Sequence, residues 1–477
     1  MRASRPRVDA VQQVILDRTA RRSGRRADLV CAAAAATLVA VAFAVPQIRG
    51  EQFVRRVYAA AAPIFGIWGP HVGWGTGPAI ALAALVVWAG PGLARRLRWS
   101  RLLPLAWVTA VAWAFALAMI DGWRVGFAGR LIRGDEYLHE VGGVHDIAAM
   151  LRGFSARILD FQPDSWTTHV SGHPPGALLT FVLLDRIGLG GGAWAAWLCV
   201  LVGCSAVVAV PVALIALGAA ERARAALPFL VLAPAAVWIA VSADAFFAGV
   251  TAWAVALLAI ATRQRTGWAG AALASGMLFG FGLYLNYGLT LMVIPAAAVL
   301  LARGFRAAVP ALIGVALVVA AFTGAGFWWL DGYHLVVQRY YQGIASVRPY
   351  SYWVWGNLAA TVCAVGLAVA AAAHRVVGGL AGTSLVRVPE VTKITARLAD
   401  WRQSVDPAAL LAAAGAVAIL AADLSGLSKA ETERIWLPFD MWLLAATALL
   451  PRRTARAWLA VQAVAALLIN HLLMTNW

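Results

Sequence analysis

The chain has 477 residues, of which 62% are hydrophobic and only 13% are charged. A soluble globular domain carries about 25% charged residues, so this composition excludes an ordinary soluble protein. The mean hydropathy of +0.76 and the many long apolar segments predict an all-α, polytopic transmembrane helical bundle. A β-barrel is excluded because the apolar runs are continuous and do not alternate with polar residues.

The net charge of +17 would indicate nucleic-acid binding in a soluble chain. In a membrane protein the same excess is expected in cytoplasmic loops, where lysine and arginine collect. Residues 1–28 are predicted to form a basic cytoplasmic arm, and its segment RTARRSGRR (18–26) suits contact with anionic lipid. We therefore expect the lipid bilayer, and no nucleic acid, as the partner of this charge.

About thirteen apolar segments are predicted to cross the membrane, the first two of them within 29–102. They lie at 29–48, 78–93, 103–121, 193–217, 226–242, 246–262, 267–284, 287–302, 306–330, 354–373, 408–424, 435–450 and 457–474.

Basic loops between these segments set the predicted orientation, because lysine and arginine favour the cytoplasmic side. The N-terminus is then cytoplasmic, the C-terminus lies outside, and the chain is a multi-pass protein of the cell membrane. The basic loops lie at 94–101, 221–225, 263–265, 303–306, 374–407 and 451–456.

This orientation requires that one apolar run does not cross the membrane. An odd number of crossings must separate the outer loop that begins at Gly122 from the basic inner loop at Glu221, yet two apolar runs lie between them. The run 174–188 has only fifteen residues and ends in Asp185-Arg186. We expect it to be a re-entrant or interface-lying helix on the outer side. The alternative is that the 194–217 run breaks into two.

The first outer loop, 122–192, holds an unusual cluster of polar residues. Its segment RGDEYLHEVGGVHD contains the adjacent acids Asp135 and Glu136, and a later segment, WTTHVSGHPPGALL, contains His169 and His173. In a solvent-exposed loop such charged side chains need have no function. A carboxylate at the mouth of a membrane cavity can instead take a proton, bind a metal or stabilise positive charge. The Pro-Pro pair after His173 suits a helix start, where free N–H groups favour a phosphate.

Further candidates lie in the other outer loops. Asp244 stands between two apolar runs. Either Ser242 or Asp244 simply caps the next helix, or Asp244 has a functional role. The loop 331–353 carries Arg339, Tyr340 and Arg348 among other tyrosines. These residues form an ordinary aromatic belt, or they bind a phosphate and a sugar ring. Arg434, in AETERIW, is predicted at the outer mouth of a span.

Together these features resemble the GT-C superfamily of integral membrane glycosyltransferases. The resemblance rests on the acidic pair after an in-to-out span, the HPP-initiated apolar helix, and an acid about seventy residues later. It is closest to protein mannosyltransferases and lipid A aminoarabinose transferases and covers about residues 103–262. It implies a GT-C-like module over 103–330 and a variable module over 331–477. Two spans precede the usual first one, and the acidic pair lies farther past its span than expected.

The resemblance implies a sugar donor carried on polyprenyl phosphate and a glycan or glycolipid acceptor, with mannose or arabinose as plausible sugars. Asp135 or Glu136 corresponds to the catalytic carboxylate, Asp135 being preferred as the base. His173 takes the position before the proline pair, and Asp244 matches the second acid. His169, Arg339, Arg348, Tyr340 and Arg434 are expected to bind substrate. No resident cofactor or metal ligand set is predicted, although a divalent cation is compatible with the sequence.

Three other functions fit parts of this pattern. Membrane carboxylates and broken helices also mark transporters and flippases, but the polar groups concentrate in outer loops and no repeated halves occur. A metal-dependent lipid-phosphate hydrolase could use His169, His173, Asp135 and His139, although Gly172 and Pro174 disfavour a regular helix there. A scaffold without activity would tolerate loss of all these residues.

Overall fold

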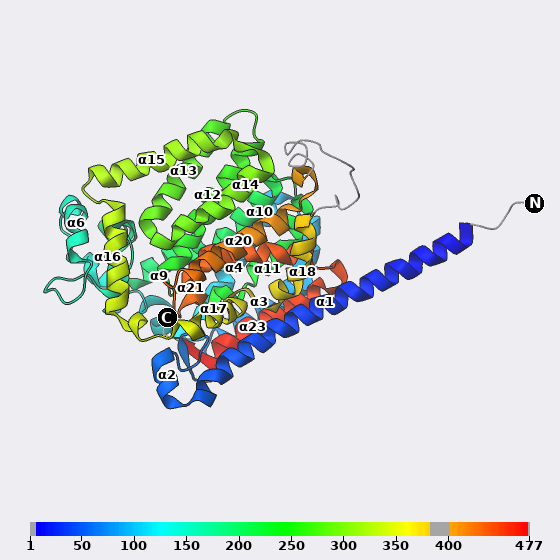
Figure 1. The fold of residues 1–477 in the computed structure, drawn as a ribbon, viewed down its shortest axis with the longest axis horizontal. Coiled ribbons are helices and arrows are strands. Elements are labelled where there is room, and N and C mark those ends of the chain that lie inside the picture. Colours follow the sequence, from blue (N-terminus) through cyan, green and yellow to red (C-terminus); the bar gives the residue numbers. More distant parts are fainter. Residues whose placement is uncertain (1–5, 382–400, 476–477) are drawn as a thin grey trace, which may run out of the picture.

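The computed structural model describes residues 6–381 and 401–475, with side chains from Gly24 onward. The described chain is helical apart from loops and one pair of three-residue strands, β1 (Gly66–Trp68) and β2 (Leu473–Thr475), which pair antiparallel. The predicted all-α class is therefore confirmed. Figure 1 shows the helices packed into one bundle, with the N-terminal part of α1 projecting beyond it.

The longer helices are α1 (Pro6–Arg49), α3 (Thr76–Arg96), α4 (Trp99–Ala118), α8 (Pro175–Arg186), α9 (Gly192–Cys204), α10 (Ala206–Ala216), α11 (Ala220–Val231), α12 (Ala243–Arg263), α13 (Trp268–Leu285), α14 (Val293–Arg303), α15 (Ala308–Gly324), α16 (Trp329–Gln342), α17 (Tyr350–Val365), α18 (Leu367–Ala381), α20 (Pro407–Leu424) and α23 (Arg452–Leu472). The shorter helices are α2 (Glu51–Val57), α5 (Leu138–Val141), α6 (Ile147–Gly153), α7 (Thr168–Ser171), α21 (Thr432–Ile435) and α22 (Leu437–Leu443). The 3-10 or π turns are η1 (Arg124–Ala128), η2 (Ser155–Arg157), η3 (Pro234–Trp238), η4 (Tyr287–Met292), η5 (Phe305–Ala307), η6 (Ile344–Ser346) and η7 (Leu444–Leu449).

Nine helical segments within residues 6–381 and 401–475 are long and apolar enough to cross a membrane. The pair α17 and α18, bent by 105°, makes a tenth if it forms one span. This is the architecture of a multi-pass membrane protein. The nine are Gly24–Arg49, Thr76–Arg96, Trp99–Ala118, Gly192–Ala216, Ala243–Arg263, Trp268–Leu285, Phe305–Gly324, Pro407–Leu424 and Arg452–Leu472.

Four of the thirteen predicted spans are not single long helices. One of them, 354–373, contains the bend between α17 and α18. The segment 226–242 is α11, which ends at Val231, followed by the short turn η3. Pro234 opens η3 and has no N–H to continue the preceding helix. The segments 287–302 and 435–450 each combine a 3-10 turn with a short α-helix. The full count of thirteen crossings stays a prediction.

Two predicted boundaries also differ. The predicted span 306–330 ends at Gly324, and the outer loop after it contains the amphipathic helix α16. The basic arm 1–28 is continuous with the first span over its described part, residues 6–28, because α1 runs without a break from Pro6. The predicted inner segment 374–407 lies partly outside the described residues.

The run after the two histidines forms a helix that is too short to cross a bilayer. α8 has 12 residues, against the ~20 that a span requires. α9 and α10 meet at Ser205 and together make a segment of 25 residues that is long enough. By length and composition, 194–217 is one span and 174–188 is not.

The loops predicted on the inner side meet one another at one end of the bundle. Arg222 binds Asp406 with its Nε 2.8 Å from Oδ2, and Arg224 donates to the carbonyl of Leu97 at 2.9 Å. Arg402 donates to the carbonyl of Leu301 at 2.7 Å. These contacts join the basic loops, as expected if they share one face of the membrane.

Candidate functional site

Arg434 stands at the centre of a buried charged network at the other end of the bundle. Its Nη1 donates to Oδ2 of Asp244 at 2.7 Å, and its Nη2 donates to Oε2 of Glu431 at 2.9 Å and faces Nε2 of His169 at 3.0 Å. The residue is 5% exposed. Burial lowers the pKa of Arg434, but Asp244 and Glu431 outweigh burial and hold it above its ordinary value. This group and the residues bonded to it are called the Arg434 network below.

Asp244 reaches Arg434 because another side chain caps its helix. Ser242 precedes α12, and its Oγ accepts from the backbone N–H of Asp244 at 3.1 Å while its hydroxyl donates to Oδ2 at 2.7 Å. Of the two residues predicted as the possible cap of this helix, Ser242 is the cap, which leaves the carboxylate of Asp244 for Arg434. Oδ1 of Asp244 is buried and has no hydrogen-bond partner among the described residues.

His169 is held in place by its two neighbours. Its Nδ1 donates to the carbonyl oxygen of Asp135 at 2.8 Å. Its Nε2 lies 3.0 Å from Nη2 of Arg434, so both ring nitrogens have a partner. His169 thereby connects the first outer loop to α21.

The two adjacent acids of the first loop occupy different environments. The side chain of Asp135 is 41% exposed and lies 3.5 Å from Nε of Arg133. The side chain of Glu136 is 7% exposed, and its Oε1 lies 3.6 Å from Nδ1 of His169. Burial raises the pKa of Glu136 against the opposing effects of His169 and Arg434. Asp135 is thus the solvent-facing carboxylate and Glu136 the internal one.

His173 is attached to the network but is not free to bind an anion. Its Nδ1 donates to the carbonyl of His169 at 2.8 Å, and its Nε2 accepts from Asn286 at 3.2 Å. Burial lowers the pKa of His173 to about 4, so the ring is neutral near pH 7. Both ring nitrogens are engaged, so His173 offers no free N–H to an anion in this arrangement.

The start of α8 is packed against α13. Pro174 precedes the helix and Pro175 occupies its first turn, as predicted. Gly176 lies so close to α13 that an added Cβ would be 2.5 Å from the carbonyl oxygen of Tyr284. The helix start is therefore buried against protein, which leaves little room for a phosphate there.

The candidates of the late outer loop join the same network from the other side. Arg348 shares Glu431 with Arg434, since its Nη1 lies 3.1 Å from Oε1 of that residue. Nε and Nη2 of Arg348 are buried without a hydrogen-bond acceptor among the described residues. Tyr340 accepts from the backbone N–H of Lys429 at 3.0 Å, and Arg348 donates to the carbonyl of the same lysine at 2.8 Å.

Arg339, on α16, reaches the loop between the two histidines. Its Nε donates to Oγ of Ser171 at 3.1 Å, and the guanidinium forms an ion pair with Asp160. The other eight residues predicted from the sequence are linked by hydrogen bonds and ion pairs, in part through Glu431 and Lys429, and Arg339 contacts α7 beside them. They come from loops that are up to about three hundred residues apart in the chain.

The turn that carries Glu431 is strained and held by a buried amide. Ala430 and Glu431 have φ of 73° and 65°, a left-handed conformation that costs free energy for residues other than glycine. Asn357, fully buried on α17, donates to the carbonyl of Ser428 at 2.7 Å and accepts from the N–H of Ala430 at 3.2 Å. It also donates to Asp423 at 2.8 Å. Asn357 thereby fixes the turn that positions Arg434.

Sequence reasoning did not single out Asn357, Asn286 or Ser171. For AETERIW it predicted either a buried Glu–Arg pair or a solvated turn, and the structure has the pair of Glu431 with Arg434. An asparagine inside an apolar run is the one signal that could have pointed to Asn357. The contacts of Asn286 and Ser171 depend on tertiary structure alone.

The Arg434 network does not fit a divalent cation. Within residues 24–381 and 401–475, no three His, Cys, Asp or Glu side chains are placed to hold a metal ion. Arg434 occupies the position between Asp244 and Glu431 where a cation would bind, and both nitrogens of His169 already face partners. This geometry gives no support to the metal-dependent hydrolase.

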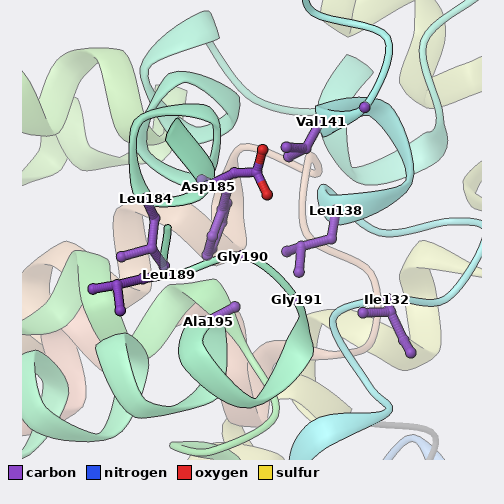
Figure 2. A pocket seen from close by; sticks show the side chains of 11 residues that line it. Ile132, Leu138, Val141, Leu184, Asp185, Leu189, Gly190, Gly191 and Ala195 are labelled. Carbon is purple, nitrogen blue, oxygen red and sulfur yellow. The ribbon is translucent and has the colours of Figure 1, made fainter. Parts of the chain in front are cut away.

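An apolar pocket of about 170 Å³ opens beside the network (Figure 2). Leu138 and Phe181 line it from α5 and α8, and Gly190 and Gly191 form its floor before α9. Asp185 is its charged residue. Phe181 of the pocket wall packs against Tyr137, which also packs against His169, so the pocket lies near the network.

Comparison with protein-family models, with curated proteins and with solved structures found no match to this chain. The function is therefore argued from the site.

Proposed function

We propose that the protein is a glycosyltransferase that takes a sugar from a polyprenyl-phosphate carrier at the outer face of the cytoplasmic membrane. The acceptor is a cell-envelope glycan or glycolipid. The observation that carries the proposal is the Arg434 network. It joins an exposed acid in the first loop, Asp135, to a second acid at the start of α12, Asp244.

The reaction needs a base and a group that binds the departing phosphate. In a single displacement, the acceptor hydroxyl oxygen forms a bond to the anomeric carbon and its proton passes to Asp135. The bond from that carbon to the phosphate oxygen breaks, and the lipid phosphate leaves with the electron pair. Attack opposite the leaving group inverts the anomeric centre. A phosphate is already a good leaving group, so no strong acid is required.

Asp135 suits the role of base because it is ionisable, exposed and held beside His169. Its backbone carbonyl accepts from His169, which fixes the loop relative to Arg434. The side chain of Glu136 is only 7% exposed, so an incoming hydroxyl reaches it less readily than it reaches Asp135. The geometry therefore favours Asp135 over Glu136.

Arg348 supports the phosphate-binding role. Two of its guanidinium nitrogens are buried without an acceptor, and leaving such donors unpaired costs free energy. A phosphate oxygen would satisfy them, since guanidinium and phosphate match in charge and geometry. The unpaired Oδ1 of Asp244 can accept from a sugar hydroxyl in the same way. The apolar pocket beside Leu138 is suited to part of the carrier's hydrocarbon chain.

The deciding experiment tests transfer directly. Purified protein in lipid vesicles is incubated with a panel of radiolabelled polyprenyl-phosphate sugars and membrane acceptors. Asp135→Asn, Glu136→Gln and Arg348→Lys are assayed beside wild type. Glu221→Gln, which changes an exposed acid at the opposite end, is the matched control. Failure of wild type to use any donor, or full transfer by all three variants, would reject the proposal.

One observation favours a transporter as the second candidate. Asp440, on α22, is fully buried, and neither carboxyl oxygen has a hydrogen-bond partner among the described residues. Ionisable groups inside membrane segments often lie on ion or proton paths. Proton or substrate flux into vesicles that is lost in Asp440→Asn, with no sugar transfer by wild type, would favour transport.

A further inference from the structure

A second hollow lies on the first outer loop, outside the Arg434 network. Its volume is about 260 Å³, and it lies between the turn after α5, helix α6 and Trp166. Its polar lining comes from His145, Asp146 and Arg157. Gly143 and Gly153 contribute no side chain to its wall. It is called the α6 cleft below.

The charges around the α6 cleft are already paired. Nη2 of Arg157 lies 3.5 Å from Glu140, and its Nε lies 3.6 Å from a carboxylate oxygen of Asp164. Asp146 caps α6, with Oδ1 accepting from two backbone N–H groups at 2.8 and 3.1 Å. Arg186 donates to the carbonyl of His145 at 2.6 Å. With cations and anions balanced, neither a phosphate nor a cation is favoured as occupant.

The polar groups favour a ligand rich in hydroxyls. A carboxylate accepts, a guanidinium donates, and an imidazole can do either, so the three complement groups that both donate and accept. Stacking on Trp166 is excluded because the guanidinium of Arg157 already covers that ring at 3.3 Å from its centre. Drug-sized ligands occupy roughly 300–1,000 Å³, so a cleft of this size suits a single sugar ring.

Glu140 connects the cleft to the Arg434 network. One of its carboxylate oxygens pairs with Arg157 in the cleft wall, and the other accepts from the backbone N–H of Thr167 at 3.0 Å. Thr167 lies two residues before His169. A ligand in the cleft is thus held by the same loop that carries Asp135 and His169.

We propose that the α6 cleft binds one neutral sugar ring of the acceptor glycan. That the sugar belongs to the acceptor rests on the proposed transferase function. Binding of a neutral sugar can nevertheless be measured without any transfer. The cleft would select an uncharged, polyhydroxylated ring and hold it beside the site where its chain is extended.

The experiment measures binding to the full-length protein in detergent. The probes are methyl glycosides of neutral hexoses and pentoses, as monosaccharides to trisaccharides, and ligand-detected NMR reports binding. Gly153→Leu fills the cleft, and an added Cβ there meets nothing within 4 Å, so the fold is expected to tolerate it. Asp146→Asn removes a charge but keeps a good helix cap. Gly270→Leu, at an equally open glycine on α13, is the matched control.

We expect at least one neutral glycoside to bind. Its Kd should rise about tenfold or more in Gly153→Leu, and it should also rise in Asp146→Asn. Gly270→Leu should bind as wild type does. Absence of binding by every glycoside, equal binding by Gly153→Leu, or preference for a sugar phosphate would overturn the inference. Sugar binding without transfer would reject the proposed transferase activity but support sugar binding in the α6 cleft. Transfer without sugar binding would support the transferase activity and reject the sugar site.

Discussion

Arg434 and Asp244 form a hydrogen bond of 2.7 Å across 190 residues of sequence. The guanidinium comes from α21, directly after the strained turn, and the carboxylate comes from the first turn of α12. Both side chains are almost fully buried. The pair crosses the predicted boundary between the modules 103–330 and 331–477, so the two modules share one buried site at this end of the bundle.

Removing Arg434 should destabilise the protein strongly. Arg434→Met leaves Asp244 and Glu431 buried without their cation, which typically costs about 3–5 kcal/mol. The double variant with Asp244→Asn should recover part of that loss. Unfolding in detergent, followed by circular dichroism, measures the change. Arg452→Met, which removes an exposed partner of Glu221, should have almost no effect. Equal stability of the two single variants would contradict the central role of Arg434.

Asp135 and Glu136 should separate activity from stability. Asp135→Asn is expected to lower sugar transfer by about 10²–10⁴-fold, the usual contribution of a general base, because it removes the proton acceptor. The melting temperature should stay near that of wild type, since the side chain is exposed. Glu136→Gln should keep more of the transfer activity. The reverse order of activities would show that Glu136 is the base.

Glu433 should make stability depend on pH. Burial raises the pKa of this carboxyl from its ordinary value of 4.5 to about 7 in the folded protein. Between these values the folded state binds a proton that the unfolded state lacks. Stability therefore falls as pH rises, by up to about 1.4 kcal/mol per pH unit, and the loss is complete above the folded pKa.

Glu433→Gln stays neutral and should not show this fall. The melting temperature of the variant minus that of wild type should be small at pH 5 and increase up to pH 8. A constant difference over that range would show that Glu433 does not titrate in the folded protein.

Gly176 should tolerate no side chain. In Gly176→Ala the new Cβ would meet the carbonyl oxygen of Tyr284 at 2.5 Å, so α8 must shift away from α13. Such overpacking typically costs about 1–3 kcal/mol. Gly153→Ala, where nothing lies within 4 Å of the added atom, is the control. A melting temperature for Gly176→Ala at or above that of the control would refute close packing at the start of α8.

Asn357 should matter for activity through the turn that it holds. Asn357→Ala removes hydrogen bonds to Asp423, Ser428 and Ala430, and it should release the left-handed turn before Arg434. We expect lower stability and a lower kcat for transfer. Thr361→Ala, one helical turn further along α17, is the control. If both variants lose stability equally but only Asn357→Ala loses kcat, a positioning role is supported. Unchanged kcat in Asn357→Ala would exclude that role.

The chain's own pattern was enough to predict an all-helical membrane bundle, because apolar length depends only on local composition. It also predicted that α8 is too short to cross and that its first turn contains Pro175, since proline fixes its own backbone angle. The basic loops were grouped correctly on one end, because their charge marks them without any knowledge of packing. The helix breaks near Pro234 and inside 435–450 were missed, because apolar runs do not show where a helix changes its hydrogen bonding.

At the candidate site the sequence determined which residue types were unusual, and the tertiary structure decided how they act. Asp135, Glu136, His169 and Asp244 stand out because charged or polar groups are costly in an apolar chain. Only the fold shows that Arg434 lies between them, that Asp135 faces solvent, and that His173 is neutral and engaged. Those properties depend on burial and on partners from distant loops, and neither can be read from the neighbours of a residue in sequence.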